Sequence, residues 1–306
     1  MFIIKYKKIF IIVSSALILL SLISITTFLM RMGPEKGGIS IDFKGGGLTK
    51  VVYLDERPSQ ETVNDSLAPL SFGAITAQPI GESGYVIKTR DLNDDEHSLL
   101  LETLGGNGAY SLSETSFTSI GPSVGRELTS KAITAIILIS LALICFIAFA
   151  FRKVSKPVSS WKYGLIAIAT LLHDVIMTIG IFTILSRTFG LEVDTLFVVA
   201  VLTILGLSVS DTIVIFDRIR ENLNDEEKSK LKFPEVVGIS IEQSYARSIA
   251  TSLTTFLVLL ALIFFGPEST KYFTIMLGTG MFFGVYSSIF LASPLLVLTE
   301  ELQKKG

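Results

Sequence analysis

The sequence predicts an α-helical integral membrane protein with six transmembrane helices and a small α+β domain between helices 1 and 2. Hydrophobic residues make up 49% of the 306 residues and charged residues only 18%, and the mean hydropathy is +0.60. Six apolar runs approach or exceed the roughly 20 residues that a helix needs to cross a bilayer. Between the first two runs, residues 31–127 are mixed in polarity and carry strand, helix and turn patterns.

The first span is interpreted as a retained anchor. Lys5, Lys7 and Lys8 precede it as in a signal peptide, but its apolar core is too long and no Ala-x-Ala cleavage site follows. The six expected spans are Ile9–Met30, Ala132–Phe151, Tyr163–Leu185, Thr195–Phe216, Ile249–Phe265 and Tyr272–Leu298. The expected segments are therefore 1–30 (cytoplasmic tail and helix 1), 31–127 (extracytoplasmic domain), 128–299 (helices 2–6) and 300–306 (cytoplasmic tail).

The basic residues predict the orientation. Cytoplasmic loops carry the excess of Lys and Arg, and the opposite short loops here carry only Arg187 and Lys271. The basic groups are Lys5, Lys7 and Lys8; Arg152, Lys153, Lys156 and Lys162; Arg218, Arg220, Lys228, Lys230 and Lys232; and Lys304 and Lys305. Both termini are therefore expected in the cytoplasm, and residues 31–127 can lie outside because long translocated segments escape the rule. We expect membrane lipid around the helices and no nucleic-acid partner.

The domain between spans 1 and 2 is expected to have the order β-α-β-β-α-β, which is the split βαβ order of ferredoxin-like folds. A strand over Ile39–Leu54 is interrupted by Gly45–Gly47, which indicates a bend or bulge. The other expected elements are a helix over Ser59–Leu70, strands over Phe72–Gln78 and Tyr85–Thr89 with a turn at Gly81–Gly84, a helix capped by Asp91 and running to Leu104, and a strand over Tyr110–Ile120.

No cofactor or metal site is expected. Cys145 is the only cysteine, which excludes an internal disulfide. It lies in an apolar run, where its side chain is expected to face lipid or to pack between helices. His97 and His173 are the only histidines and show no metal-ligand spacing; His97 is expected on the surface or partly packed. Gly45–Gly47 interrupts a strand and lacks the Gly-Lys-Ser/Thr of a phosphate loop.

Asp211 lies inside the apolar run Thr195–Phe216, where a carboxylate costs about 2.5–3.5 kcal/mol on insertion scales. Such a residue normally faces a bundle interior or a hydrated path and often serves ion or proton movement. The alternative is a carboxylate near the helix end that water reaches. Ser208 and Thr212 fall within one turn of Asp211, and Gly206 is expected to let a neighbouring backbone approach.

His173 and Asp174 lie near the middle of span 3. Adjacent helical residues point about 100° apart, so the two side chains are not expected to face one partner directly. One interpretation makes them members of a hydrated relay, because histidine titrates near neutral pH. The other makes them a hydrogen-bonded interhelical pair that fixes packing.

Arg247 and Thr251 lie one turn apart on one face at the start of span 5. Arg247 can snorkel to the cytoplasmic surface, or it can form a switchable pair with Asp211 at similar depth. A pair that protonation breaks is one physical way to link a proton to helix movement.

The cytoplasmic exit of span 4 carries Asp217, Arg218, Arg220 and Glu221. Arg218 and Glu221 are i,i+3 neighbours, so a solvated ion pair is expected. In span 6, Gly280 and Gly284 form a Gly-x-x-x-Gly pair, which indicates helix contact.

Asp211–Asn222 closely resembles the signature of the SecF family of bacterial preprotein translocase subunits. Three more blocks agree, namely Ile41–Gly46, Gly121–Glu127 and Arg247–Thr255. His173–Asp174 and Tyr286–Ser288 also fit, so the resemblance covers nearly the whole chain.

The resemblance implies half of a twelve-span bundle of the RND superfamily, with SecD as the other half. It further implies a role in late-stage export across the bacterial cytoplasmic (inner) membrane, driven by the proton or sodium motive force. The implied partners are SecD, the SecY–SecE–SecG channel, YajC and the translocating preprotein. The implied chemistry is ion-coupled transport rather than catalysis, so no catalytic residue is expected.

The resemblance implies an ion path of Asp211, Arg247 and Thr251, with Asp211 as the titrating group, and His173 and Asp174 are added as candidates. The family often has Asn before the aspartate, where this chain has Ser210. That departure leaves coupling details and ion choice open.

Three other functions are weighed. An RND-type exporter of lipids or small hydrophobic molecules predicts a second six-span repeat and larger outer domains, and this chain has neither. An intramembrane aspartyl protease needs two membrane aspartates, which Asp174 and Asp211 supply, but no Gly-x-Gly-Asp occurs. A scaffold predicts that Asp211→Asn leaves export unchanged.

Overall fold

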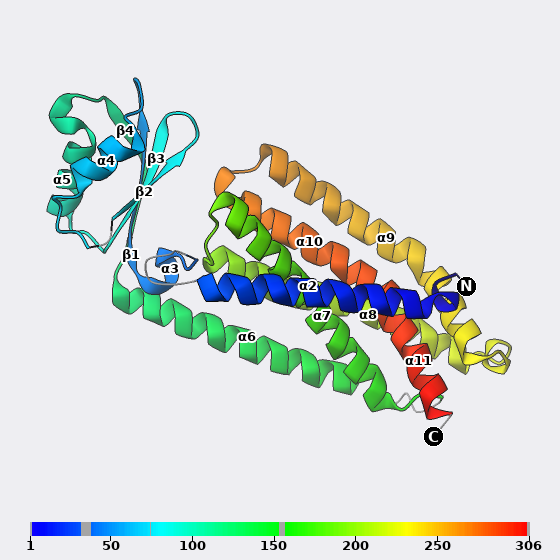
Figure 1. Ribbon diagram of the computed structural model, residues 1–306. Coiled ribbons are helices and arrows are strands. Elements are labelled where there is room, and N and C mark those ends of the chain that lie inside the picture. The colour runs from blue at the N-terminus through cyan, green and yellow to red at the C-terminus, as the bar shows by residue number, and fades with distance from the viewer. Residues whose placement is uncertain (1, 32–37, 74, 153–156, 305–306) are drawn as a thin grey trace. The chain divides into compact units, whose positions relative to one another are not determined.

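The computed structural model describes residues 2–31, 38–73, 75–152 and 157–304, which form two compact units (Figure 1). The bundle unit comprises Met1–Arg31, Ala135–Leu191 and Leu196–Gly306, and the sheet unit comprises Met32–Thr134 with Glu192–Thr195. The boundaries expected at residues 30, 127 and 299 stay predictions. Lys153, Lys156 and Lys305, used above for orientation, lie outside the described residues.

Within the described residues, six helical segments are long and apolar enough to cross a membrane, as expected. They are α2 (Lys7–Arg31), α6 (Pro122–Ala150), α7 (Ser160–Phe189), α8 (Thr195–Asn224), α9 (Phe233–Phe265), and a last span divided into α10 (Lys271–Ser287), the π-helical turn η4 (Ser288–Ala292) and α11 (Ser293–Gln303). A short helix, α1 (Phe2–Lys5), precedes α2. The polar stretch before Ile249 continues α9 back to Phe233, with Pro234 in the first turn, where a missing N–H costs nothing.

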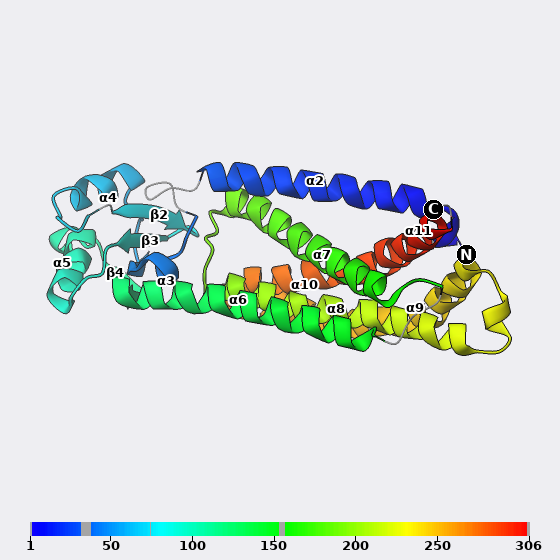
Figure 2. The same ribbon diagram turned by 90° about the horizontal axis from the view of Figure 1, so that it is seen from below.

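Helix α7 lies at the centre of the bundle unit, with α2 and α10 packed against it and α9 packed against α10 (Figure 2). The core of the bundle unit includes the rings of Phe151, Tyr163 and Phe216, whose centroids lie 5.4–5.9 Å apart. Cys145 on α6 is exposed, as expected for a lipid-facing residue.

The two ends of the chain meet at one end of the bundle unit. Lys7 of α2 forms an ion pair with Glu301 of α11. Lys162 of α7 donates to Gln303 at 3.1 Å. These contacts gather the first, third and last spans at the end that carries the basic residues.

The sheet unit has the expected β-α-β-β-α-β order. Its elements are β1 (Gly46–Tyr53), α4 (Gln60–Leu67), β2 (Thr76–Ile80), β3 (Gly84–Thr89), α5 (Asp94–Leu104) and β4 (Leu112–Ile120). In the described residues, the strands form one antiparallel sheet in the order β2-β3-β1-β4, with Val51 opposite Tyr85 and Thr49 opposite Phe117. Its core contains the buried rings of Tyr53 and Tyr85.

Two local expectations in this unit are corrected. Ile41–Lys44 is a helical turn, α3, rather than strand, because the Ser40 hydroxyl caps it and Gly45 ends it at a φ of 79°. Asn93 rather than Asp91 caps α5, in a capping box with Glu96. Asp91 instead accepts a hydrogen bond from the Ser119 hydroxyl at 2.5 Å.

Two glycine-containing segments of the sheet unit, Ile41–Gly46 and Gly121–Glu127, contact each other. A β-carbon on Gly125 of α6 would come within 2.8 Å of the Gly45 backbone nitrogen and 3.0 Å of the Phe43 carbonyl oxygen. The Thr129 hydroxyl also donates to the Phe43 carbonyl at 3.2 Å. Glycine at position 125 therefore lets α6 begin directly against the α3–β1 turn.

His97 on α5 is partly packed, as expected. Its ring stacks on Phe117 with a centroid separation of 3.7 Å, and its Nε2 lies 3.1 Å from a Glu114 oxygen. Both contacts tie α5 to β4.

Candidate ion-path site

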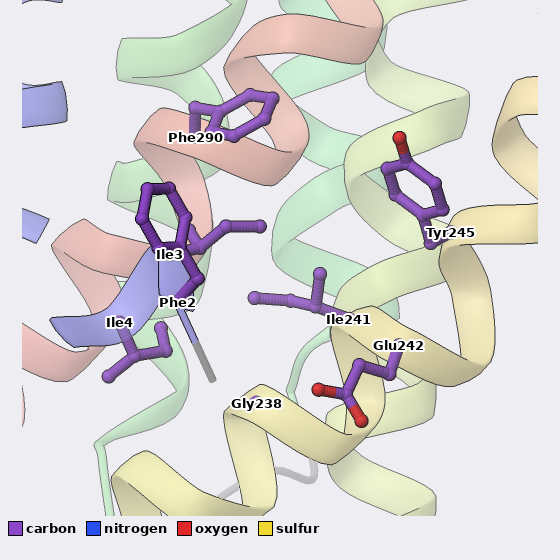
Figure 3. A pocket seen from close by; sticks show the side chains of 8 residues that line it. All are labelled: Phe2, Ile3, Ile4, Gly238, Ile241, Glu242, Tyr245 and Phe290. Atoms are coloured by element: carbon purple, nitrogen blue, oxygen red, sulfur yellow. The ribbon is translucent and has the colours of Figure 1, made fainter. Parts of the chain in front are cut away.

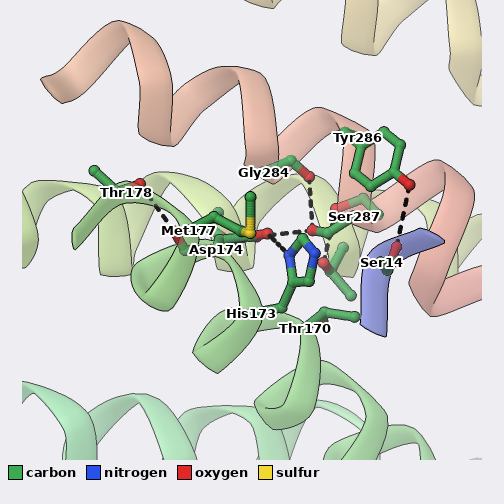
Figure 4. Close-up of polar contacts among 12 residues, drawn as sticks. Ser14, Thr170, His173, Asp174, Met177, Thr178, Gly284, Tyr286 and Ser287 are labelled. Atoms are coloured by element: carbon green, nitrogen blue, oxygen red, sulfur yellow. Dashed lines mark hydrogen bonds and ion pairs between the residues drawn. The ribbon is translucent and has the colours of Figure 1, made fainter. Parts of the chain in front are cut away.

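Asp174 is the centre of a buried polar cluster in the middle of α7 (Figure 4). Its Oδ1 lies 2.8 Å from Nδ1 of the adjacent His173. The two side chains therefore bond to each other, an arrangement that the sequence analysis did not anticipate. Both side chains are fully buried, so their polar atoms depend on protein partners.

Two serines from other spans bind the second oxygen of Asp174. The Ser208 hydroxyl of α8 and the Ser287 hydroxyl of α10 both donate to Oδ2, the latter at 2.7 Å. The carboxyl group of α7 is thereby joined to α8 and α10. Burial of a carboxylate is costly unless hydrogen bonds compensate it, and these donors supply that compensation.

Small residues allow α8 and α10 to approach this closely. A β-carbon on Gly284 would lie 3.3 Å from the Ser208 Cα, and one on Gly280 would lie 2.4 Å from Ile204 Cγ1. The helix contact predicted for Gly280 and Gly284 is confirmed. The backbone approach predicted at Gly206 is wrong, since no atom of the described residues lies within 4 Å of a β-carbon there.

The π-helical turn η4 begins directly after Ser287. Ser288 pairs with Thr212 of α8 at 2.8 Å, and the Ser293 hydroxyl donates to the Ser288 carbonyl at 3.1 Å. A π turn is wider than an α turn and is often found at functional sites. Here two consecutive serines reach two different helices, α7 through Ser287 and α8 through Ser288.

The imidazole of His173 is enclosed by aromatic rings. Its centroid lies 6.2 Å from that of Tyr286 and 6.3 Å from that of Phe283. Nε2 has no hydrogen-bond partner among the described residues. A buried N–H without an acceptor is less stable than an unprotonated ring nitrogen without a donor. We therefore assign the tautomer in which Nδ1 carries the proton and donates it to Asp174. Tyr286 in turn pairs through its hydroxyl with Ser14 of α2 at 3.1 Å.

Asp211 lies one turn beyond Ser208 on α8, half-buried and close enough to Asp174 for the two carboxyl groups to interact electrostatically. Arg247 and Thr251 lie on α9 with exposed side chains. Among the described residues, Asp211 and Arg247 form no ion pair with each other. The structure therefore gathers His173 and Asp174 with Asp211 nearby, and it leaves Arg247 and Thr251 apart from them.

The exit of α8 carries the expected ion pairs. Arg218 donates to Glu221 at 2.6 Å, and Arg220 pairs with Asp217. All four side chains are at least partly exposed, so these are surface pairs of small energetic weight.

The last residue of the α8 signature has a role that sequence reasoning missed. Asn222 is buried, donates to Ser240 and Gln243 of α9 at 2.8 Å each, and accepts from Lys228 at 3.0 Å. It joins the end of α8 to the start of α9. The roles of Ser287 and Ser288 were missed as well. Their sequence signals were the fit of Tyr286–Ser288 to the family pattern and two consecutive hydroxyls in an apolar span.

Within the described residues, no three His, Cys, Asp or Glu side chains gather as metal ligands. A separate pocket of about 420 Å³ lies between α1, α9 and η4 (Figure 3). Its lining is mostly apolar, with Glu242 and Tyr245 as polar members, and it includes none of the predicted ion-path residues.

Comparison with known proteins gives consistent matches. The family model described as protein export membrane protein SecD/SecF, C-terminal, matches residues 101–302. The protein translocase subunit SecF of Thermobaculum terrenum is 40% identical over 312 residues, covering 97% of this chain and 93% of the relative. The SecF of Synechocystis sp. is 34% identical, covering 95% and 91%.

Two solved structures have the same fold over nearly the whole chain. The crystal structure of SecDF from Thermus thermophilus has a TM-score of 0.78 and 28% identity. SecDF in the super-membrane-facing form has a TM-score of 0.65 and 30% identity. Each match covers 96% of this chain but only 38% of the SecDF chain, so this chain spans well under half of the SecDF length.

Proposed function

The chain belongs to the SecF family of protein translocase subunits, and from this membership we propose that it pairs with a separate SecD chain to promote late-stage protein export with an ion gradient. It is a multi-pass membrane protein of the protein-export machinery. The pairing with SecD is supported by the SecDF chains, in which the part that resembles this chain accounts for 38% of the length.

The observation that carries ion coupling is the junction of three spans at one buried carboxyl group. Asp174 of α7 accepts hydrogen bonds from α8 and α10, and Asp211 lies one turn from the α8 donor. Binding or release of a proton or a sodium ion here changes the charge that these bonds stabilise. A change of charge at the junction therefore alters how strongly the three helices are held together.

Asp211, which is half-buried, is the group that exchanges the ion, and Asp174 with His173 transmits its charge to the helices. Arg247 and Thr251 complete the path in the assembled complex, where a SecD partner covers their exposed face of α9. The proposed chemistry is transport without catalysis.

The proposed location is the bacterial cytoplasmic (inner) membrane with both termini in the cytoplasm. An even number of spans brings both termini to one side, and the Lys7–Glu301 pair supports that arrangement. The basic residues at this end support the cytoplasmic side. The channel proteins SecY, SecE and SecG, together with YajC and the preprotein, are the proposed partners. The antiparallel order β2-β3-β1-β4 supports a ferredoxin-like fold for the domain. Its proposed place on the other side follows from the orientation of the spans.

The test compares wild type with Asp211→Asn in inverted membrane vesicles that contain SecD and the channel. ATP starts translocation, ATP is removed, and a proton or sodium gradient is imposed while completion of a stalled preprotein is followed. Asp217→Asn is the matched control, because it makes the same chemical change at the exposed end of the same helix.

We expect Asp211→Asn to lose gradient-driven completion, with the complex still assembled, and Asp217→Asn to retain it. The gradient that drives wild type identifies the ion. Normal completion by Asp211→Asn contradicts the ion-path role and favours a scaffold.

A further inference from the structure

The hydroxyl of Ser287 has two acceptors in reach. It lies 2.7 Å from Asp174 Oδ2 and 3.2 Å from the Gly284 carbonyl oxygen of its own helix. A hydroxyl group has one proton to donate and two lone pairs with which to accept. Ser287 can therefore donate across to α7 or back to α10, but not fully to both.

Ser208 differs from Ser287 in this respect. Its hydroxyl donates to the same Asp174 Oδ2. Its backbone position on α8 is held by the close approach of Gly284. The two serines are thus matched as donors to one oxygen, and Ser287 also has an acceptor within its own helix.

The charge of Asp174 decides which of the two bonds Ser287 makes. An ionised Oδ2 accepts from both serines. When a proton is added at Oδ2, that oxygen acquires an O–H to donate, and Ser287 Oγ accepts it while its own proton turns to the Gly284 carbonyl. Asp174 Oδ2 and the hydroxyls of Ser208 and Ser287 stay paired in both states. The α7–α10 bond changes from charge-assisted to neutral, which is roughly half as strong.

The last span is built to respond at this point. Ser287 is the final residue of α10, and the π-helical turn Ser288–Ala292 follows at once. Ser288 is held to Thr212 of α8, so weakening of the bond at Ser287 loosens α10 from α7 while the turn stays attached to α8.

We propose that Ser287 is a positioning residue that couples the charge of Asp174 to the position of α10 against α7. With Asp174 ionised, Ser287 holds α10 to α7; with Asp174 neutral, the bond reverses and α10 shifts about the π turn. The titratable groups next to Asp174 are His173 on its own helix and Asp211 on α8. Tyr286 on α10 stacks on the His173 ring, and its hydroxyl pairs with Ser14. This inference rests on the proposed ion-coupled function and assigns the element that moves.

The experiment measures a distance between α7 and α10 in the complex with SecD, in lipid bilayers. Spin labels are placed at Leu172→Cys on α7 and Phe282→Cys on α10, both exposed, after Cys145→Ala removes the native cysteine. Four labelled backgrounds are used: wild type, Ser287→Ala, Ser208→Ala as matched control, and Ser287→Thr, which restores a hydroxyl. The distance is measured in each background with Asp174 and again with Asp174→Asn, whose amide N–H donates as the neutral acid does.

We expect Asp174→Asn to shift the inter-label distance on the order of 1–2 Å in wild type, in Ser208→Ala and in Ser287→Thr. In Ser287→Ala the distance is already shifted, and Asp174→Asn adds nothing. A full response in Ser287→Ala overturns the proposal, and so does the absence of any response in wild type. The outcome is independent of the Asp211→Asn export assay, so the switch and the ion-path role can fail separately.

Discussion

Gly280 of α10 lies directly against Ile204 of α8, with no room for a larger residue. A β-carbon on Gly280 would come within 2.4–2.8 Å of three Ile204 side-chain atoms. Since the two helices carry Ser287 and Ser208, this contact sets the distance across which both serines reach Asp174.

Gly280→Ala is expected to destabilise the bundle by about 1–3 kcal/mol, because it overpacks the α8–α10 contact. The measurement is reversible unfolding in detergent micelles. Gly206→Ala is the control. Within the part of the chain that the structure describes, no atom lies within 4 Å of its β-carbon, so we expect no loss of stability and a gain of up to about 1 kcal/mol from helix propensity. Equal losses in the two variants would contradict close packing at Gly280.

Asp174→Ala is expected to lower the free energy of unfolding by on the order of 3 kcal/mol, because it removes the acceptor of two buried donors, His173 and Ser208. Ser287 keeps an acceptor in the Gly284 carbonyl. The same unfolding experiment measures it. Asp211→Ala, at a half-buried carboxyl without a hydrogen bond to the described residues, should cost much less. The prediction fails if Asp211→Ala is the more damaging of the two.

Asn222→Ala is expected to destabilise the α8–α9 junction by about 2 kcal/mol, since it removes the hydrogen bonds of Asn222 to Ser240, Gln243 and Lys228. Protease sensitivity of the segment between α8 and α9 reports the effect locally. Asn224→Ala, at the exposed end of the same helix, is the control. Similar cleavage of both variants would show that Asn222 does not hold the junction.

The stability of α5 is expected to depend on pH through Glu96. The Arg90 side chain, which bonds Glu96 Oε1 at 2.5 Å, and the Asn93 N–H lower the pKa of this carboxyl group. A carboxyl whose pKa falls on folding stabilises the protein above its unfolded pKa of about 4.3, and loses that effect as pH falls through the folded value.

Wild type should therefore protect the α5 amides from hydrogen exchange better than Glu96→Gln near neutral pH, and the difference should close in acid. Comparing variants at one pH cancels the intrinsic exchange rates. Glu102→Gln, exposed on the same helix, should show no such difference. A difference that persists at low pH would exclude the Arg90–Glu96 bond as its cause.

Much of the fold was predictable because its signals are local. A span is recognisable from its own apolar residues, and all six were found within the described chain. The β-α-β-β-α-β order followed from turn residues and alternation. The errors arose where a local cap overrode the expected element. Ser40 and Gly45 made a helical turn of Ile41–Lys44, and Asn93 formed a capping box that Asp91 could not.

The candidate site was only partly predictable. A charged residue in an apolar run is visible in the sequence, so Asp174 and Asp211 were both identified. Which of the two carboxyl groups is more deeply buried was not visible, because burial depends on neighbouring helices. Asp174 is enclosed by Ser208 and Ser287, whereas Asp211 is half-exposed.

The sequence by itself determined the family, the six spans and the mixed domain, since each rests on patterns within one segment or on ordered motifs. The tertiary structure alone decided that residues 34 and 113 positions from Asp174 bind the same carboxylate oxygen. It also decided that Gly280 rather than Gly206 is the close contact. The physical reason is that hydrogen bonds and close packing depend on distances between helices, which no single segment encodes.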